Sequence, residues 1–295
     1  MAKQWKVVLI AVTLLTATAY QVWAQETAAP PVLRIEREEI KPGTGSQHER
    51  EANGYVNLST KMKSKYHWVG MEAVTGDENS ALFFMGFGTF ADMEKNQGEF
   101  AAANSGSLKA EAERLDREGG LIHTRQTALV GVLRPDLSYH LEGITLKTMA
   151  QVRFFNVVTF RTRPGSDQRF AAGARIYYAA LEKAHITRPL AMYQVIAGAP
   201  NGTYIIIEGY HSLGDMDAVD RPAIMQALGA DNLKKLDEIE HTDFISTESN
   251  LYAVNPAMSY APKEVVSESP DFWNPKPAAK PRTAAKEKKE PQKNQ

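Results

Sequence analysis

The chain has 295 residues, a formal net charge of −1 and no cysteine, and 43% of its residues are hydrophobic. The lack of cysteine excludes disulfides, thiolate nucleophiles, zinc–thiolate sites and iron–sulfur clusters. Stability must therefore come from buried apolar area, which two domains of ordinary size can supply.

Residues 1–24 have the pattern of a secretory signal peptide. Two lysines precede an apolar stretch over Val7–Ala19, and Val22 and Ala24 take the −3 and −1 positions of a signal-peptidase site. The apolar stretch is shorter than the roughly 20 residues that a membrane span needs. We predict cleavage after Ala24 and a secreted or periplasmic protein. An uncleaved membrane anchor is the alternative.

The sequence from about 32 to 140 recurs at about 153–261, which indicates a duplicated domain rather than a short solenoid repeat. Paired residues share an offset of 122 in the first part and 121 in the last part. The pairs are Pro42 with Pro164, Ala52 with Ala174, Tyr55 with Tyr177, Lys61 with Lys183, Gly76 with Gly198, Asn79 with Asn201, Leu115 with Leu236 and Tyr139 with Tyr260.

The first copy, predicted at 31–142, has the order strand, helix, strand, strand, helix, strand. Strands are predicted where β-branched and aromatic residues gather, and helices where apolar residues recur every three to four positions. The strands are Val32–Glu39, His67–Val74, Ala81–Phe87 and Leu121–Val130, and the helical stretches are Ser46–Lys63, Ala91–Ala103 and Ser107–Arg117.

The second copy, predicted at 150–262, follows the same order. Its first helix begins at Ser166 or Asp167 and ends near His185, and its second covers Asp215–Ile239 with an interruption near Gly229. Its strands are Phe154–Phe160, Met192–Ile196, Thr203–Gly209 and Thr242–Leu251.

This order is the ferredoxin-like pattern, so the predicted fold class is α+β. Each sheet carries helices on one face, and we expect two tandem ferredoxin-like domains packed sheet to sheet. With Lys41-Pro42-Gly43 and Arg163-Pro164-Gly165 closing the first strand of each copy, the chain resembles the dimeric α/β-barrel superfamily. Within it, the chain is most similar to the NIPSNAP and antibiotic-biosynthesis-monooxygenase type. The resemblance implies a fused pseudo-dimeric α/β barrel with a pocket between the sheets, but not a particular chemistry.

Charged residues alternate with apolar ones along the first predicted strand. If Leu33 and Ile35 pack under the helices, then Arg34, Glu36 and Glu38 point between the sheets. Carboxylates beside an arginine in such a place suit acid–base chemistry. The alternative is a solvent-facing strand with ordinary charges.

Two histidines of the first copy stand where the second copy has phenylalanine. His123, which shares a strand face with Arg125, aligns with Phe244, and His48 aligns with Phe170. Such an exchange can mark a site gained on a duplicated scaffold. The alternative is a partly buried, hydrogen-bonded histidine.

Aromatic and acidic residues alternate on one predicted strand of the second copy. Tyr204, Glu208 and Tyr210 share one face there, and an aromatic-lined pocket with one carboxylate suits a small organic ligand. We therefore include these three residues in the predicted pocket.

Known cofactor and catalytic motifs are missing from the sequence. His48-Glu49-Arg50-Glu51 begins like a zinc-protease helix, but Ala52 stands at the position of the second histidine, so no metal site is predicted. Haem-binding relatives generally use a histidine on a later helix of the repeat, and Asp92–Arg117 and Asp215–Ile239 contain none. No cofactor is predicted, and haem is disfavoured.

The last segment, 274–295, carries seven lysines and arginines against Glu287 and Glu290. We predict a disordered basic tail. It is suited to contact anionic polymers of the cell envelope, or it serves only as a solubilising extension. Without this tail the body is acidic, so no nucleic-acid binding is expected of it.

Together these features predict an exported protein that binds or converts a small organic molecule between its two sheets. The alternative is a non-enzymatic interaction or structural protein of the cell envelope. The sequence leaves open whether the protein is an enzyme, and whether it is a monomer or a homodimer.

Overall fold

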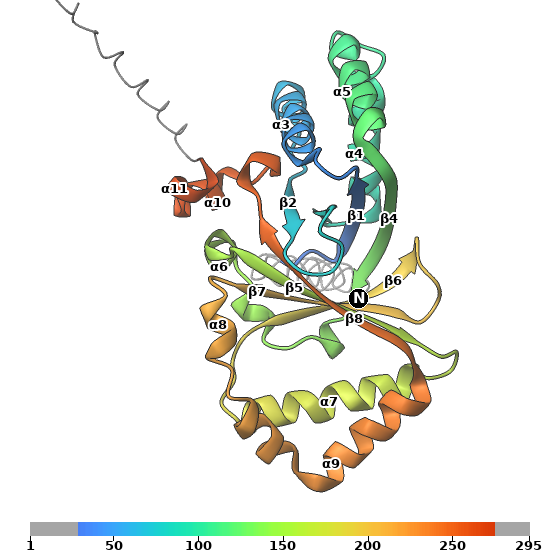
Figure 1. The fold of residues 1–295 in the computed structure, drawn as a ribbon, viewed down its shortest axis with the longest axis vertical. Helices are drawn as coiled ribbons and strands as arrows, with labels where there is room; N and C mark the ends of the chain where they lie inside the picture. Colours follow the sequence, from blue (N-terminus) through green and yellow to red (C-terminus); the bar gives the residue numbers. More distant parts are fainter. Residues whose placement is uncertain (1–28, 275–295) are drawn as a thin grey trace, which may run out of the picture.

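A computed structural model describes residues 29–274 of the chain, so the predicted signal peptide and the tail from residue 275 lie outside the described residues. Eight antiparallel strands form one closed barrel in the order β1-β3-β2-β8-β5-β7-β6-β4 (Figure 1). The predicted α+β fold, in which two ferredoxin-like halves meet sheet to sheet, is confirmed. The boundaries 31–142 and 150–262 stay predictions.

The first half contributes four strands and three longer helices. These are β1 (Val32–Ile40), α3 (Gly45–Met62), β2 (Trp68–Ala73), β3 (Ser80–Phe87), α4 (Phe90–Ala103), α5 (Lys109–Ile122) and β4 (His123–Leu133). The short elements η2 (Pro135–Leu137), η3 (Leu141–Gly143) and α6 (Leu146–Gln151) lead to the second half.

The second half repeats this order. Its elements are β5 (Phe154–Thr162), α7 (Asp167–Lys183), β6 (Leu190–Ala197), β7 (Thr203–Tyr210), α8 (Gly214–Asp217), α9 (Arg221–Asp243) and β8 (Phe244–Val254), followed by η4 (Pro256–Met258), α10 (Lys263–Glu268) and α11 (Pro270–Trp273). The interruption predicted near Gly229 is a kink inside α9, where that glycine has a φ of 68°. Within residues 29–274, the helices are all too short or too polar to cross a membrane.

Strand register shows that the two halves are built alike. Ile40 pairs with His123 after an irregularity at the end of β1, and Thr162 pairs with Phe244 after the same irregularity at the end of β5. Residues that align in the sequence therefore take equivalent places in the two halves.

The halves close the barrel through each other. β4 pairs with β6, and β2 pairs with β8. Beyond its last strand, each half reaches across to the other: Tyr139 bridges to Leu190, and Tyr260 bridges to Trp68. Neither half could form this barrel alone.

The barrel interior is filled with apolar side chains from both halves. Leu33 and Ile35 point into it, together with Met71, Leu82, Phe84, Phe155, Val157, Ile205, Ile207, Tyr252 and Val254. Interiors of eight-stranded barrels are just wide enough for side chains to fill, and the space left beside this core is about 130 Å³. The predicted ligand pocket between the sheets is therefore wrong.

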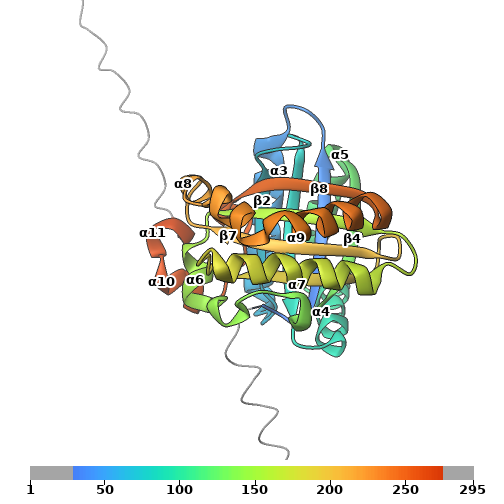
Figure 2. The ribbon, with the colours of Figure 1, turned by 90° about the horizontal axis from the view of Figure 1, so that it is seen from below.

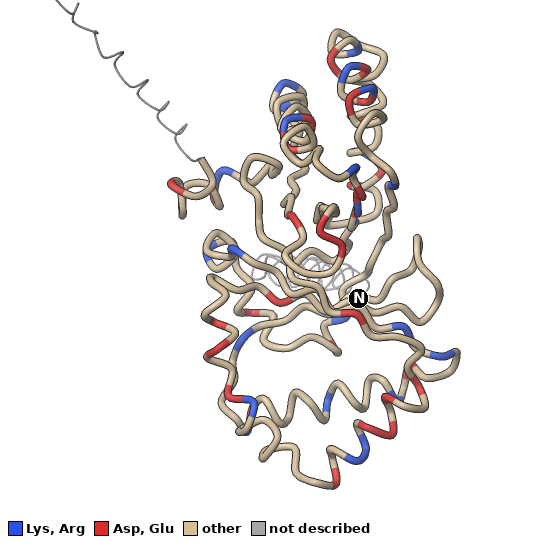
Figure 3. Tube along the Cα trace, in the orientation of Figure 1, with Lys and Arg blue, Asp and Glu red and all other residues tan. Residues whose placement is uncertain are grey.

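Helices cover the outside of the barrel. α3, α4 and α5 lie over the sheet of the first half, and α7 and α9 lie over that of the second half (Figures 1 and 2). Acidic and basic residues both occur along α3, α5 and α9 (Figure 3).

Candidate functional site

A cavity of about 730 Å³ lies between the sheet of the first half and its helices. This volume is in the range of sites for small organic ligands. The wall includes the aromatic residues Tyr55, Trp68, Phe83 and Phe100. Its polar lining comes from Arg34, Glu36, Glu38, Glu51, Asn96, Gln97, Asn104, Asp116, His123 and Gln126.

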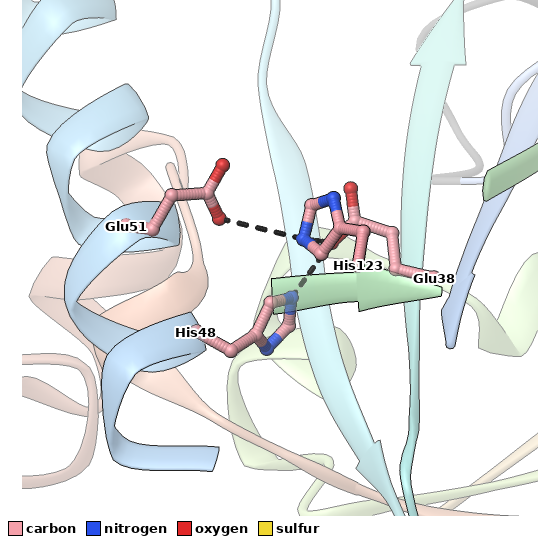
Figure 4. Close-up of side chains that lie close together, drawn as sticks. All are labelled: Glu38, His48, Glu51 and His123. Carbon is pink, nitrogen blue, oxygen red and sulfur yellow. Dashed lines mark hydrogen bonds and ion pairs between the residues drawn. The ribbon is translucent and has the colours of Figure 1, made fainter. Parts of the chain in front are cut away.

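Four ionisable side chains converge at one side of this cavity (Figure 4). Glu38 comes from β1, His48 and Glu51 come from α3, and His123 begins β4. His48 and Glu51 are three residues apart, a spacing that places them on the same face of a helix. One nitrogen or oxygen atom of each residue lies within 4.8 Å of those of the other three. We call these residues the polar cluster.

Hydrogen bonds hold Glu38 at the centre of the polar cluster. Its Oε2 lies 2.7 Å from Nε2 of His48, and its Oε1 accepts a hydrogen bond of 2.7 Å from Nε2 of Gln126. Both oxygens of this carboxylate are therefore occupied.

The side chain of His123 is buried, and one of its ring nitrogens has no close partner. Its Nε2 lies 3.5 Å from Oε2 of Glu38 and 3.8 Å from Oε2 of Glu51. Only 8% of the side chain is exposed, and this nitrogen has no hydrogen-bond partner among residues 29–274. Buried polar atoms are normally hydrogen-bonded. Nε2 of His123 is therefore available to bind an ion or molecule that is not part of the chain.

Burial and neighbouring charges shift the pKa values of the polar cluster in different directions. Burial raises the pKa of Glu38, but the hydrogen bond to His48 and the charge of His123 outweigh it, and the net pKa is lowered. Burial lowers the pKa of His123. Burial, reinforced by the nearby charge of Glu38, raises the pKa of Glu51 to about 8. Near neutral pH the cluster thus holds a carboxylate at Glu38 and a carboxylic acid at Glu51.

The raised pKa of Glu51 should appear in the pH dependence of stability. Its ordinary pKa is 4.5 and its folded value is about 8, so the folded state binds the extra proton between these values. The free energy of unfolding should therefore fall as pH rises from about 4.5 to about 8, by up to about 1.4 kcal/mol per pH unit. Urea unfolding of metal-free protein across this range measures the slope.

Glu51→Gln should flatten this slope, because an amide does not titrate. Glu94→Gln, at an exposed glutamate of α4, is the matched control and should keep it. If the free energy of unfolding of Glu51→Gln falls with pH as steeply as that of the wild type, the raised pKa does not belong to Glu51.

Glycine at position 119 of α5 makes room for the polar cluster. A Cβ atom there would lie 2.9 Å from Oε1 of Glu51 and 3.3 Å from Cε1 of His123. Any larger residue would push these two side chains away from their places.

The second half has no polar cluster at the equivalent positions. Phe160, Phe170 and Phe244 stand where the first half has Glu38, His48 and His123, and Gly173 stands in place of Glu51. The three phenylalanine rings pack together with centroids 5.4–5.8 Å apart. An apolar cluster thus fills this place in the same fold, so the fold does not require the polar one.

Four of the eight sequence-predicted site residues lie together. Arg34, Glu36, Glu38 and His123 line the cavity, and Arg34 donates a hydrogen bond to Glu36. They face the helices, not the space between the sheets, because Leu33 and Ile35 take the inner face of β1. The strand face assigned from the sequence was wrong by one residue.

Arg125 lies outside the cavity. Its side chain is 67% exposed and its guanidinium is 3.7 Å from Glu39. Its place in a shared pocket, as predicted from the sequence, is wrong.

The three residues predicted from the second half lie under its own helices. Tyr204 is buried, stacks on Phe170 and donates a hydrogen bond to Asp167, and Tyr210 donates one to Glu208. The pocket predicted to join them with Arg34, Glu36 and Glu38 does not form, because the filled barrel core lies between the two outer faces.

Sequence reasoning missed Glu51 as a site residue. It was noted only as part of a failed zinc-protease motif, although it aligns with Gly173 in the second copy. The exchange of a glycine for a buried glutamate, beside two histidines that replace phenylalanine, was the signal that could have found it.

Comparisons with known proteins bear on the fold alone. No protein-family model matches the sequence, and no curated protein matches it. Solved structures with a similar fold include an anthrone oxidase-like protein, with 14% identity, a TM-score of 0.44, and coverage of 78% of this chain and 93% of that chain. Chlorite dismutase from Candidatus Nitrospira defluvii is similar at 12% identity and a TM-score of 0.44, with 85% of this chain and 99% of that chain covered.

The described residues do not offer the helix histidine considered for haem. α4 and α5 contain no histidine, and His241 near the end of α9 is exposed and bonded to Asp237. On α3, His48 belongs to the polar cluster, where its Nε2 lies 2.7 Å from Oε2 of Glu38. That haem is disfavoured stays a prediction.

Proposed function

We propose that the protein is exported and binds and converts a small organic molecule in the cavity of its first half. The observation that carries the proposal is the contrast between the halves. One half has a polar cluster beside a cavity of about 730 Å³, while the other has packed phenylalanines. Export rests on the signal-peptide pattern of residues 1–24.

The lining favours a neutral or cationic ligand with an apolar or aromatic part. Glu36, Glu38 and Asp116 face the cavity as acidic groups against Arg34, and Arg34 is already paired with Glu36. An anion would meet net repulsion there. The aromatic side chains of the wall suit flat apolar groups.

The polar cluster can donate a proton to such a ligand. Glu51, whose pKa is about 8, is a carboxylic acid at neutral pH and can transfer its proton. Glu38, whose pKa is lowered and whose two oxygens already accept hydrogen bonds, stays charged beside it, and two carboxyl groups whose pKa values are set apart in this way are typical of acid–base sites in enzymes. We therefore propose a reaction with proton transfer at the ligand.

Filling the cavity should abolish ligand binding. Gly120 lines the cavity, and a Cβ atom there would meet nothing within 4 Å, so a side chain can start there without a clash and Gly120→Phe adds a ring at the cavity wall. We expect neutral or basic members of a metabolite library to raise the melting temperature of the wild type by about 5–10 °C at 100 times their Kd. The variant should lose this shift.

Gly98→Phe is the matched control. Gly98 is also a helix glycine of the first half with nothing within 4 Å of its Cβ, but it does not line the cavity. Gly98→Phe should show the same ligand-induced rises in melting temperature as the wild type. Equal shifts in Gly120→Phe and Gly98→Phe, or shifts only with anions, would contradict the proposal.

A further inference from the structure

We propose that Glu38, His48, Glu51 and His123 form a binding site for one divalent first-row transition-metal ion. Each residue offers one ligand atom, and the four atoms lie within 4.8 Å of one another. Ligand atoms around such an ion, at bonds of about 2.0–2.2 Å, lie at most about 4.4 Å apart, slightly less than the present limit. Small side-chain shifts therefore suffice to bring all four atoms onto one ion.

The donor set defines the class of ion. Two imidazoles and two carboxylates suit zinc, iron, cobalt and manganese, whereas soft ions such as Cu(I) prefer sulfur ligands. This site has no sulfur donor, since the chain contains no cysteine. Four protein ligands would also leave room at a six-coordinate ion for groups from the adjoining cavity.

The buried nitrogen of His123 is an independent reason for a metal. Its side chain is 8% exposed, yet Nε2 has no hydrogen-bond partner among residues 29–274 and is directed at the two carboxylates. A buried ring nitrogen without a hydrogen-bond partner in the protein is suited to bind a metal ion.

The residues around the polar cluster support metal ligation. Gln126 fixes the carboxylate of Glu38 through a 2.7 Å hydrogen bond, and partners of this kind orient metal ligands in proteins. Gly119 provides the space in which Glu51 and His123 meet. The cavity gives an ion a path from solvent.

The internal duplication argues against a purely structural role. All four positions are phenylalanine or glycine in the second half, where they pack without polar groups. Two buried carboxylates and two histidines are unfavourable in such a place unless something compensates for their desolvation. A bound cation would compensate.

Metal binding is tested without an organic ligand, so its outcome is separate from that of the proposed function. The purified protein is treated with EDTA, dialysed, and titrated with Co²⁺ by visible absorption and with Zn²⁺ by calorimetry. We expect one ion per chain with micromolar or tighter affinity. With an ion bound, Glu38 and Glu51 would both be its ligands, so the proton transfer proposed above belongs to the metal-free protein.

Variants that copy the second half should lose the site. His48→Phe and His123→Phe should each weaken binding by at least about 100-fold, since even the loss of an outer partner weakens metal sites by about 10–100-fold. Glu51→Gln, which is nearly isosteric, gives the same test if a phenylalanine variant fails to fold.

His140→Phe is the matched control. His140 contacts Glu142 and Glu182 at 2.6 and 3.0 Å on the surface, so it has carboxylate partners but no second histidine. Its variant should bind Co²⁺ like the wild type. The inference is overturned if the stripped wild type binds less than one ion, or if the variants of His48 and His123 bind as tightly as His140→Phe.

Discussion

Gly198→Ala is expected to destabilise the protein far more than Gly76→Ala, although these two glycines occupy sister positions. Gly198 has a φ of 87°, and a Cβ atom there would lie 2.1 Å from the carbonyl oxygen of Ala128 and 2.6 Å from Cα of Leu129. Both atoms belong to the backbone of β4, which pairs with β6 to join the two halves. The clash can be relieved only by separating these strands.

At Gly76 the conformation is similar, with a φ of 84°, but the obstacle differs. A Cβ atom there would meet Oδ1 of the Asn250 side chain, which can rotate away. We expect Gly76→Ala to lower the free energy of unfolding by about 1–2 kcal/mol, the cost of a left-handed conformation for alanine. Gly198→Ala should lower it by about 4 kcal/mol or more, or prevent folding.

Urea unfolding of the variants measures both effects. Gly43→Ala and Gly165→Ala serve as controls, since these glycines have φ values of 82° and 85° with nothing within 4 Å of a Cβ atom. The losses of unfolding free energy in these two controls measure the cost of a left-handed conformation for alanine, without any clash. A loss in Gly198→Ala no greater than that in Gly43→Ala would mean that the β4–β6 contact is not tight.

Local patterns and the duplication made most of the fold predictable. The predicted strand Val32–Glu39 is Val32–Ile40 in the structure, and the predicted helix Ser46–Lys63 is Gly45–Met62. The spacing of apolar residues predicts the bounds of such strands and helices to within a few residues. The repeat then required two similar halves, and the ferredoxin-like order leaves each sheet one free face to bury against the other.

Which face of each strand turns inward could not be predicted. Both faces of β1 are covered, one by the barrel core and the other by helices, so alternation of apolar and charged residues does not identify the inside. Leu33 and Ile35 suit either place. The charged face lies under helices because the first half has a cavity there, a property that arises from the packing of α3, α4 and α5.

The polar cluster is partly visible in the sequence. Comparing the copies draws attention to His48 and His123, because both replace phenylalanine. Their convergence with Glu38 depends on tertiary structure, since β1, α3 and β4 meet only once the sheet has formed. Sequence distance alone, as between His123 and Glu38, gives no sign of a contact at 3.5 Å.

Replacing the polar cluster by its apolar sister set is expected to stabilise the protein while removing its site. The variant carries Glu38→Phe, His48→Phe, Glu51→Gly and His123→Phe. Exchanging buried ionic groups for packed apolar ones is commonly neutral or stabilising by about 1–4 kcal/mol, and glycine in a helix costs about 1 kcal/mol. We expect a net gain of about 2 kcal/mol in the free energy of unfolding, measured in urea at neutral pH with EDTA.

The reverse exchange in the second half is the control. Phe170 is 4% exposed and packs against Phe160, Phe244 and Tyr204, so Phe170→His should lower the free energy of unfolding by about 3 kcal/mol. The fourfold variant should also lose Co²⁺ binding and ligand-induced thermal shifts, because no ionisable group of the polar cluster remains. If instead it is less stable than the metal-free wild type, the polar cluster contributes to the fold itself, and its retention in one half needs no functional explanation.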